Sequence, residues 1–411
     1  MTRALRRAGF LCVLAVAALA SASTTAVAQV SAITHGEGLA GLWASARTAV
    51  IDGDMTTAIP QLEALVAADP RNVHYRFELA LALYRQGIRD RAAFHIEQLR
   101  GATLKPGERA AVEQLAREIE NSSDWTGYVT FGIEPQSNTT GQTKDDTVNI
   151  GGFDFILNQD ALGNSGTLYR LQLGATYTPL LGEAWRGNFG IDLETVRGPR
   201  TALYEDHTTL TFGLRPALTK GRFASFGLRA ARHSYGTGTV NRSEALFASY
   251  GWRPTQAGQI KLGGTARRLR YDDPLRPDTK ELGVTLTYGH AIGGNARLEG
   301  TLSRTNYYSD KPSDDGRRYA VSLSGLYAFD GGLIGGLTIR YSDDRRDGIV
   351  HLFGVQRHER KRSIEARLHH AQFTLFGFAP QLRVGYEVND SSIPLTDHDN
   401  RYATIAFSRQ F

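Results

Sequence analysis

Arg401-Tyr-Ala-Thr-Ile-Ala-Phe-Ser-Arg-Gln-Phe411, the stretch that ends the chain, alternates more apolar and more polar side chains. In an extended strand, one face would carry Ala403, Ile405, Phe407 and Phe411, and the other Tyr402, Thr404, Ala406, Ser408 and Gln410. Alternating strands of about ten residues are typical of bacterial outer-membrane β-barrels, whose side chains face lipid and lumen in turn. The pattern therefore predicts a transmembrane barrel strand that ends in an aromatic residue.

The first residues of the chain have the features of a secretory signal. Three arginines within residues 1–7 precede an apolar run at 10–20, which is too short to span a membrane as a helix. Ala26-Val-Ala28 matches the small-residue cleavage signature. We therefore expect a signal peptide at residues 1–28 rather than a membrane anchor. The single cysteine, Cys12, lies within it, so the mature chain would contain no disulfide and no thiolate metal site.

The composition excludes some classes of protein. The chain has 411 residues, enough for two domains, with 47 basic and 42 acidic residues. Without the three arginines of the predicted signal the balance is 44 to 42, so the chain lacks the basic excess of a nucleic-acid-binding protein. After residue 28 no apolar run is long enough for a membrane helix. Alternating strands are the remaining way for such a chain to cross a membrane.

Residues 29–122 are expected to form a periplasmic helical domain with an internal repeat. Three small residues recur at a spacing of 34: Ala46, Gly53 and Ala58 return as Ala80, Gly87 and Ala92. This period and this pattern of small residues are typical of tetratricopeptide repeats. The alanines would let paired helices approach closely, and each glycine would end a helix. A further helix over 107–120 would cap the two repeats.

Two interpretations of this helical domain stay open. Either it forms a groove that receives a segment of another protein, or it is a pair of helical hairpins without a binding role. The candidate groove residues are Tyr75, Arg76, Tyr84 and Arg85.

From Trp125 onward the apolar period becomes two, which predicts strands. We expect them at 148–158, 167–178, 185–196, 207–217, 222–233, 242–252, 259–271, 280–291, 295–306, 317–329, 333–342, 361–371, 381–390 and 401–411. Their charged residues must face a wet lumen, because a charge in lipid costs about 2–4 kcal/mol near the midplane. The lumenal arginine candidates, which would set ion selectivity or simply keep a pore wet, are Arg229, Arg267, Arg297, Arg340 and Arg383.

Short and long connections alternate, as they do in outer-membrane barrels with short periplasmic turns and long outer loops. Short turns include 219–221, 292–295 and 330–332, and long links include 307–316 and 343–360. The predicted fold class is α+β: a helical domain, a connector at 123–147, and an antiparallel barrel of about 14 strands at 148–411. The connector contains a strand-like segment, 126–134, and the count would rise to 16 if the barrel includes it. A soluble β-sandwich or propeller explains these features less well.

Two segments carry a resemblance to a known family. Phe131-Gly-Ile-Glu-Pro-Gln-Ser-Asn138 stands at the barrel entrance, and Pro380-Gln-Leu-Arg-Val-Gly-Tyr-Glu-Val-Asn-Asp-Ser-Ser-Ile393 precedes the last strand. Together with the signal peptide, the repeats and the barrel, they resemble the surface lipoprotein assembly modifiers, or Slam proteins, of diderm bacteria. The matching residues are Glu134, Pro135, Ser137, Asn138, Asn389, Ser391, Ile393 and Phe411.

The resemblance implies an outer-membrane translocon that delivers a substrate protein from the periplasm to the cell surface. The substrate is either a surface lipoprotein or a soluble secreted protein. Further expected partners are outer-membrane lipid and the barrel assembly machinery, which would contact the strand that ends at Phe411. Two alternatives remain open. A passive porin for small solutes would conduct at rest, and a polysaccharide export barrel would carry a longer repeat array.

Enzyme chemistry is not predicted from this sequence. A phosphate loop is missing, and the neighbouring His369 and His370 would point to opposite faces of a strand. Asp397-His-Asp-Asn400 has the oxygen donors that calcium prefers, but a solvated outer loop is its expected role. We therefore expect no catalytic residue, no cofactor and no metal site.

Overall fold

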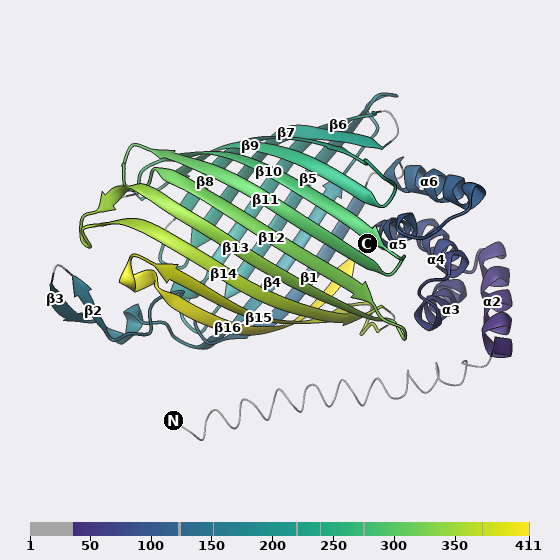
Figure 1. Cartoon of the computed structure of the whole chain (residues 1–411), viewed down its shortest axis with the longest axis horizontal. Coiled ribbons are helices and arrows are strands. Elements are labelled where there is room, and N and C mark those ends of the chain that lie inside the picture. Colours follow the sequence, from purple (N-terminus) through teal and green to yellow (C-terminus); the bar gives the residue numbers. More distant parts are fainter. Residues whose placement is uncertain are drawn as a thin grey trace, which may run out of the picture.

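The structure is a computed structural model that describes residues 36–121, 125–150, 152–218, 221–238, 240–273, 276–371 and 373–410. It consists of a helical domain and a closed β-barrel, and the helical domain lies at one end of the barrel (Figure 1). The predicted signal peptide and Phe411 lie outside the described residues.

Five helices make up the N-terminal part of the described chain: α2 (Gly36–Ile51), α3 (Met55–Ala68), α4 (Val73–Arg85), α5 (Arg89–Arg100) and α6 (Pro106–Asn121). Gly53 and Gly87 lie in the turns of the two hairpins with φ of 79° and 83°, which glycine adopts without strain. The repeated alanines, Ala46, Ala58, Ala80 and Ala92, are all 0% exposed in the helical core. The predicted close approach of the helices is therefore confirmed, while the tetratricopeptide assignment stays a prediction. Among the described residues, each helix is too short or too polar to cross a membrane.

The barrel strands are β1 (Trp125–Gln136), β4 (Gly166–Tyr177), β5 (Trp185–Arg197), β6 (Glu205–Pro216), β7 (Arg222–Tyr235), β8 (Val240–Trp252), β9 (Gly258–Tyr271), β10 (Thr279–Ile292), β11 (Ala296–Ser309), β12 (Gly316–Ala328), β13 (Leu333–Val350), β14 (Val355–His370), β15 (Ala379–Ser391) and β16 (His398–Gln410). Neighbours pair antiparallel, and β1 pairs with β16 to close the ring. The α+β class and the 14 strands are confirmed. Closure removes the open sheet edge that lipid cannot satisfy with hydrogen bonds.

The prediction of a first barrel strand at 148–158 is wrong. That segment forms a separate hairpin of β2 (Thr147–Ile150) and β3 (Phe153–Ile156), and β1 takes its place in the barrel. The reason is length. The hairpin strands have 4 residues each, whereas a membrane-crossing strand needs about 9–11. β1 has 12 residues and pairs with β4 along all of them, so the count of 14 stands with a different first strand.

The predicted long loop at 343–360 is also mostly strand. β13 continues to Val350 and β14 begins at Val355, so this hairpin has a short tip. The charged residues of this hairpin lie on regular strands because they pair with one another. The Asp343 carboxylate lies 2.8 Å from Arg345 Nε and 3.0 Å from His358 Nε2. A run of charges that is typical of a loop in the sequence therefore forms pairs in the structure, along β13 between Asp343 and Arg345 and across to β14 between Asp343 and His358.

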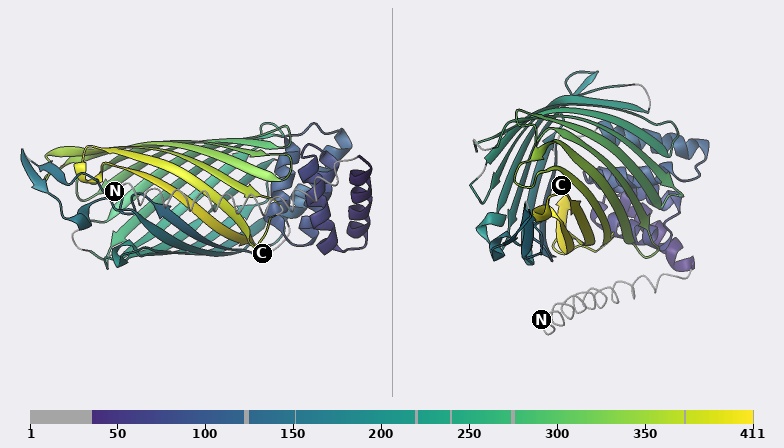
Figure 2. Two further views of the ribbon diagram at one scale, coloured as in Figure 1. Left: turned by 90° about the horizontal axis from the view of Figure 1, so that it is seen from below. Right: turned by 60° about the vertical axis from the view of Figure 1, so that its left-hand side comes forward.

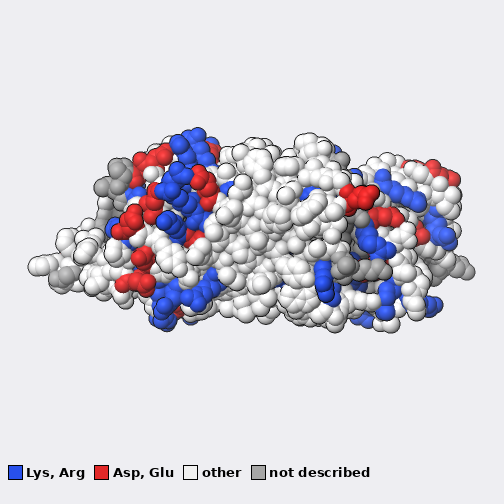
Figure 3. All heavy atoms as spheres, turned by 90° about the horizontal axis from the view of Figure 1, so that it is seen from above, with Lys and Arg blue, Asp and Glu red and all other residues white. Residues whose placement is uncertain are grey.

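The two faces of the strands differ as predicted. On β10, Leu282, Val284 and Leu286 are 50%, 56% and 41% exposed on the outer face. Thr287, between Leu286 and the outward Tyr288, faces the lumen, where its Oγ1 lies 3.2 Å from Thr301 Oγ1 of β11. Figure 3 shows the result: the middle of the barrel is nearly free of charged atoms on the face shown, and charges gather toward the two ends. The pale middle has the character of a lipid-facing band.

The chain direction fixes which end of the barrel is which. β1 begins and β16 ends beside the helical domain, and the turns at 253–257, 293–295 and 329–332 lie at the same end (Figures 1 and 2). The β2–β3 hairpin and the long β13–β14 hairpin lie at the other end. Short turns mark the periplasmic side of an outer-membrane barrel. The helical domain is therefore on the periplasmic side.

Candidate functional site

The first and last strands of the barrel meet in a seam with a gap. β1 pairs with β16 on either side of Glu134 and Pro135 but not at these two residues. Ser137 N–H donates to the Arg401 carbonyl of β16 at 2.8 Å, so alternate residues of β1, including Pro135, turn their nitrogen toward β16. Because proline has no N–H, the ladder lacks a bond there. On its other side, β1 pairs with β4 without a gap.

Side chains bridge the seam where the backbone does not. Glu134 is only 8% exposed, and its Oε2 accepts a hydrogen bond of 2.7 Å from Thr404 Oγ1 of β16. Its Oε1 accepts a bond of 2.6 Å from Gln136 Nε2, and Arg170 Nη2 of β4 lies 3.8 Å from the same oxygen. A buried carboxylate is costly unless it has such partners. Glu134 therefore ties β1 to both of its neighbours.

Two asparagines close the outer end of the seam. Asn400 Oδ1 accepts the Asn138 N–H at 3.0 Å, and Asn400 Nδ2 donates to Gln136 Oε1 at 3.0 Å. Asn138 is 2% exposed, and its side chain donates to the Gln142 carbonyl at 2.8 Å and accepts the Gly141 N–H at 3.0 Å. Buried amides with all these partners rigidify a junction.

The second predicted segment meets the first at this junction. Asn389 Nδ2 donates to the Thr396 carbonyl at 2.8 Å, and Ser391 Oγ accepts the Ile393 N–H at 3.0 Å. Ile393 is 6% exposed. These bonds shape the loop from β15 to β16, which reaches the loop after β1 through Thr143 N–H and the Leu395 carbonyl at 2.9 Å.

The structure thus brings seven of the eight residues that match the family to one end of the seam, from two segments about 250 residues apart in the chain. Asn138 also meets Asn400, which lies 262 residues further along. The eighth, Phe411, lies outside the described residues.

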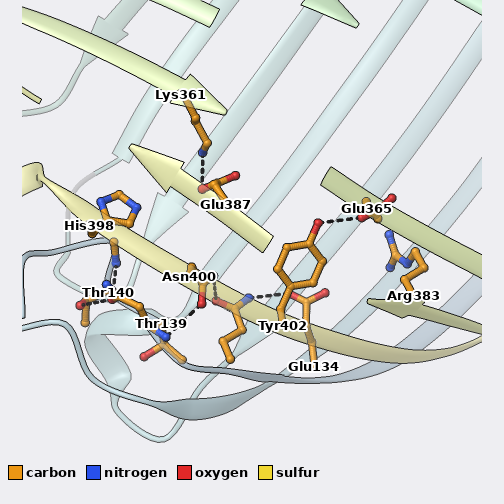
Figure 4. A pocket seen from close by; sticks show the side chains of 13 residues that line it. Glu134, Thr139, Thr140, Lys361, Glu365, Arg383, Glu387, His398, Asn400 and Tyr402 are labelled. Carbon is orange, nitrogen blue, oxygen red and sulfur yellow. Dashed lines mark hydrogen bonds and ion pairs between the residues drawn. The ribbon is translucent and has the colours of Figure 1, made fainter. Parts of the chain in front are cut away.

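A polar recess of about 470 Å³ opens into the lumen beside this junction (Figure 4). Lys361 Nζ lies 2.6 Å from Glu387, and Tyr402 Oη donates to Glu365 at 2.9 Å across it. The lining residues are Glu134, Gln136, Asn138, Thr139, Thr140, Gly141, Lys361, Glu365, Arg383, Glu387, His398, Asn400 and Tyr402. Paired charges and amides make this recess suitable for polar groups such as peptide backbone.

The expectation of a solvated outer loop at 397–400 is wrong for most of that segment, because β16 begins at His398. The carboxylates of this segment have protein partners. Asp397 Oδ2 accepts the Ser391 N–H at 3.1 Å, and Asp399 lies 2.7 Å from Lys144 Nζ. Within the described ranges, no group of three or more His, Cys, Asp or Glu residues is placed to hold a metal ion.

Charged pairs line the lumen further along the strands. Arg267 Nη2 lies 2.8 Å from Glu281, Arg318 Nη2 lies 2.7 Å from Asp344, and Arg170 contacts Glu194. The predicted lumenal position of Arg267 is consistent with its partner, since Glu281 alternates with the outward Leu282. Charged pairs of this kind need a hydrated lumen, which suits a channel better than a packed core.

A salt-bridge cluster attaches the helical domain to the periplasmic turns. Glu97 on α5 lies 2.7 Å from Arg253, in the turn after β8, and 3.6 Å from Arg297 on β11. Arg100 also contacts Glu97 and lies 2.9 Å from Glu113 on α6. We call Glu97, Arg100, Arg253 and Arg297 the docking cluster. It joins both parts of the molecule through one carboxylate.

The electrostatics of the docking cluster favour ionised carboxylates. Burial acts to raise the pKa of Glu97, but the charge of Arg100 and the hydrogen bond from Arg253 outweigh it and lower the pKa below 4.5. The hydrogen bond from Arg100 likewise lowers the pKa of Glu113. Both groups are therefore charged in the docked structure at neutral pH.

Backbone contacts reinforce the docking. Gly331 N–H, in the turn after β12, donates to the Ala67 carbonyl of α3 at 2.6 Å. A Cβ on Gly101 would lie 2.7 Å from the Ala291 backbone of β10, so only glycine fits there. The helical domain therefore lies directly on the periplasmic rim.

The four groove candidates have different environments in the structure. Arg76 is 2% exposed, donating to the Pro70 carbonyl at 2.5 Å and to His95 Nδ1 at 3.3 Å. Its burial removes Arg76 from the groove candidates. Tyr75 is half-buried against Trp43, with ring centroids 5.0 Å apart, and Tyr84 packs on the helical core. Arg85 is exposed and donates to the Val50 carbonyl at 3.4 Å.

Sequence reasoning missed Glu97, Arg253 and Thr404. Glu97 and Arg253 carry no motif, and only the docking of the two parts brings them together. Thr404 lies at a lumenal position of the last strand, which alternation identifies, but its bond to Glu134 depends on closure of the barrel.

The fold and the site define an outer-membrane β-barrel of the transport or channel type with a periplasmic helical domain. Residues 329–411 match the family model described as surface lipoprotein assembly modifier. Over 378 residues the chain is 21% identical to surface lipoprotein assembly modifier 1 of Neisseria meningitidis serogroup B, covering 90% of this chain and 75% of that protein. The resemblance seen in the sequence motifs is thus confirmed: the chain is similar to surface lipoprotein assembly modifiers along most of its length.

Solved barrels also align with the structure, at low similarity. The outer-membrane channel DcaP of Acinetobacter baumannii is 11% identical with a TM-score of 0.42, covering 71% of this chain and 97% of that one. The anion-selective porin of Comamonas acidovorans is 12% identical with a TM-score of 0.40, covering 71% and 99%.

Proposed function

We propose that this protein is an outer-membrane translocon that delivers a substrate protein, a surface lipoprotein or a secreted protein, from the periplasm to the cell surface. The observation that carries the proposal is the docking of the helical domain onto the periplasmic rim through Glu97, Arg253 and Arg297. A passive pore needs no soluble domain at its entrance. In a translocon, such a domain would stand where the substrate arrives.

The barrel supports this role by its size and its lining. Fourteen strands enclose a lumen wider than that of 8-stranded barrels, which side chains fill. The recess at the seam offers backbone-sized polar partners such as Asn138, Asn400 and Tyr402. The similarity to surface lipoprotein assembly modifier 1 supports a lipoprotein as one class of substrate.

The proposal includes the maturation of the chain. Residues 1–28 are removed as a signal peptide, and the last strand guides insertion by the barrel assembly machinery into outer-membrane lipid. The helical domain then receives the substrate in the periplasm.

A passive porin is the second candidate, favoured by the paired charges of the lumen. The two functions differ at rest, because a porin conducts steadily and a translocon is closed until its substrate engages. In a planar bilayer, a porin would show steady conductance whose ion selectivity changes in the lumenal Arg340→Glu variant. The matched control is Arg360→Glu, because Arg360 lies on the same face of β14 as the outward Ile364 and so faces away from the lumen.

The deciding experiment is protease exposure of tagged candidate substrates on intact cells with and without this protein. Translocation predicts that a substrate becomes protease-sensitive only when the barrel is present, while a soluble periplasmic control stays protected. A tagged lipoprotein and a tagged soluble protein, tested side by side, separate the two substrate classes. Protection of every candidate, together with steady conductance of the purified barrel, would exclude the translocon.

A further inference from the structure

Arginine and lysine side chains gather on the outside of the barrel at the end away from the helical domain (Figure 3). Arg232, Arg242 and Arg270 lie there on β7, β8 and β9, and all three are exposed. They share the face of outward leucines on the same strands: Leu228, Leu246 and Leu262 are 56%, 61% and 47% exposed. The arginines therefore point to the membrane side of the strands and not into the lumen.

The register places these cations directly beside one another. Arg232 pairs with Arg242, Arg242 with Arg270, and Lys280 with Arg268 on the neighbouring strands. Like charges at directly opposed positions destabilise a sheet. An array of this kind is unfavourable by itself, and bound anions would offset the repulsion.

The carboxylates of the protein neutralise only part of this array. Arg242 lies 3.5 Å from Asp272, Arg268 lies 2.9 Å from Asp278, and Arg270 lies 2.6 Å from Glu244. Four further cations of the same surface have no carboxylate within 4.0 Å among the described residues: Arg232, Lys280, Arg304 and Arg317. We call the three paired arginines and these four cations, seven residues in all, the outer basic belt. It has a surplus of positive charge.

The height of the belt matches the head groups of the outer leaflet. Tyr319, 44% exposed, follows Arg317 by two residues toward the membrane centre, and Arg304 lies over its ring at 5.5 Å. Leu282, 50% exposed, follows Lys280 in the same way. Outward aromatic residues mark the boundary between lipid tails and head groups in these barrels. The guanidinium groups therefore lie just outside the apolar band.

The belt occupies one side of the barrel. It spans β7 to β12, and β10 lies seven strands from β1 in either direction around the ring. Farther round, Arg345 lies 2.8 Å from Asp343, Arg362 contacts Asp390, and Arg360 is in register with both of these acids. Arg401 on β16 is a single outward cation without a carboxylate within 4.0 Å among the described residues. The surplus charge is thus centred opposite the seam.

We propose that the outer basic belt is a binding site for the phosphate groups of phosphorylated glycolipid in the outer leaflet. Arginine forks bind phosphate through paired N–H···O bonds, and a row of them matches a head group with more than one phosphate. The lipid anchors the barrel wall opposite the seam. The site depends on the membrane orientation of the barrel and not on the identity of its substrate.

The test uses the purified full-length chain and measures bound lipid per barrel by native mass spectrometry. The belt variant combines Arg232→Gln, Arg242→Gln and Arg270→Gln. The matched control combines Arg229→Gln, Lys261→Gln and Arg267→Gln, which removes three charges from the lumenal face of β7 and β9. The probes are lipopolysaccharide, phosphatidylglycerol and inorganic phosphate, and heat-dependent gel mobility verifies that each variant is folded.

The proposal expects lipopolysaccharide to bind the unaltered chain and the control alike. The belt variant should bind it roughly tenfold or more weakly, because several charge-assisted bonds are lost. A second belt variant with lysine at the three positions should fall between, since it keeps charge but loses the forks. Equal affinity of belt variant and control would overturn the proposal. Binding of inorganic phosphate as tightly as lipopolysaccharide would also overturn it, because the belt would then be a general anion site.

Discussion

Glu97→Gln should loosen the helical domain from the barrel. The Glu97 carboxylate is the common partner of Arg100, Arg253 and Arg297. Its loss leaves Arg253 without a carboxylate partner among the described residues, while Arg100 keeps Glu113 and Arg297 keeps Glu299. The side chains of Arg100, Arg253 and Arg297 are 6%, 15% and 28% exposed, and that of Glu97 is 24% exposed. The cluster is therefore neither a surface pair nor a fully buried one.

The magnitude follows from that intermediate burial. Breaking a fully buried pair costs about 3–5 kcal/mol, and a surface pair contributes about 0–1 kcal/mol. We expect a loss of about 2 kcal/mol in docking free energy for Glu97→Gln, which raises the undocked population roughly 30-fold. In a double-mutant cycle with Arg253→Gln, the coupling energy should be about 1–2 kcal/mol, because the two residues share one contact.

Hydrogen exchange on the full-length chain is the assay. Amides of α5 and of the turn at 253–257 should exchange faster in Glu97→Gln, while strands far from the rim keep their rates. Glu113→Gln is the matched control, since Glu113 pairs with Arg100 inside the helical domain and has no barrel cation within 4.0 Å among the described residues. If Glu97→Gln and the unaltered chain exchange equally at the turn, the docking cluster does not hold the domain and the reasoning is refuted.

Three further predictions follow from the same contacts. Acid should loosen the helical domain in two steps. In the first, the stability of the domain falls as pH drops below 6.5, because burial and the charges of Arg76 and Arg91 hold the pKa of His95 well below that value. In the second, docking, which is complete above about pH 4.5, is lost as pH falls through the lowered pKa values of Glu97 and Glu113. Circular dichroism and exchange against pH would show both steps, and a single step would contradict the assignment. Asn138→Ala should destabilise the seam by about 2–3 kcal/mol, because the side-chain bonds to Gln142 and Gly141 are lost. Urea unfolding in detergent measures this loss. In the control variant Asn149→Ala, in the exposed β2–β3 hairpin, the free energy of unfolding should change by no more than about 0.5 kcal/mol. Pro135→Ala should stabilise the seam by about 0.5–1.5 kcal/mol by restoring an N–H toward β16, visible as a higher temperature for the gel mobility shift, and an unchanged or lower temperature would show that the gap does not weaken the seam.

The strands of the barrel were accessible from the sequence because their signal is local. Alternation at a period of two depends only on neighbouring side chains, and it placed β4 to β16 within a few residues of their observed bounds, except that β13 ends 8 residues later and β14 begins 6 residues earlier than predicted. It failed at 148–158 and 126–134, since both segments alternate. Only pairing along β4 and β16 decides which of them is the barrel strand.

The helical domain shows the same division. The spacing of 34 residues predicted the two hairpins, because small residues and glycines act within each turn. The pattern could not place Arg76, since the repeat spacing does not show which way a helix turns each side chain. The burial of Arg76 against Pro70 and His95 is a result of packing between hairpins.

By itself, the sequence determined the class of fold, the lipid-facing and lumenal sides of most strands, and the two motif segments, because each of these depends on residues close together in the chain. Only the tertiary structure decided that Asn138 meets Asn400, that Glu97 meets Arg253, and that Arg232, Arg242 and Arg270 stand side by side. These contacts arise from barrel closure, from domain docking and from strand register. All three are set by the summed free energy of many distant pairs, which no local pattern records.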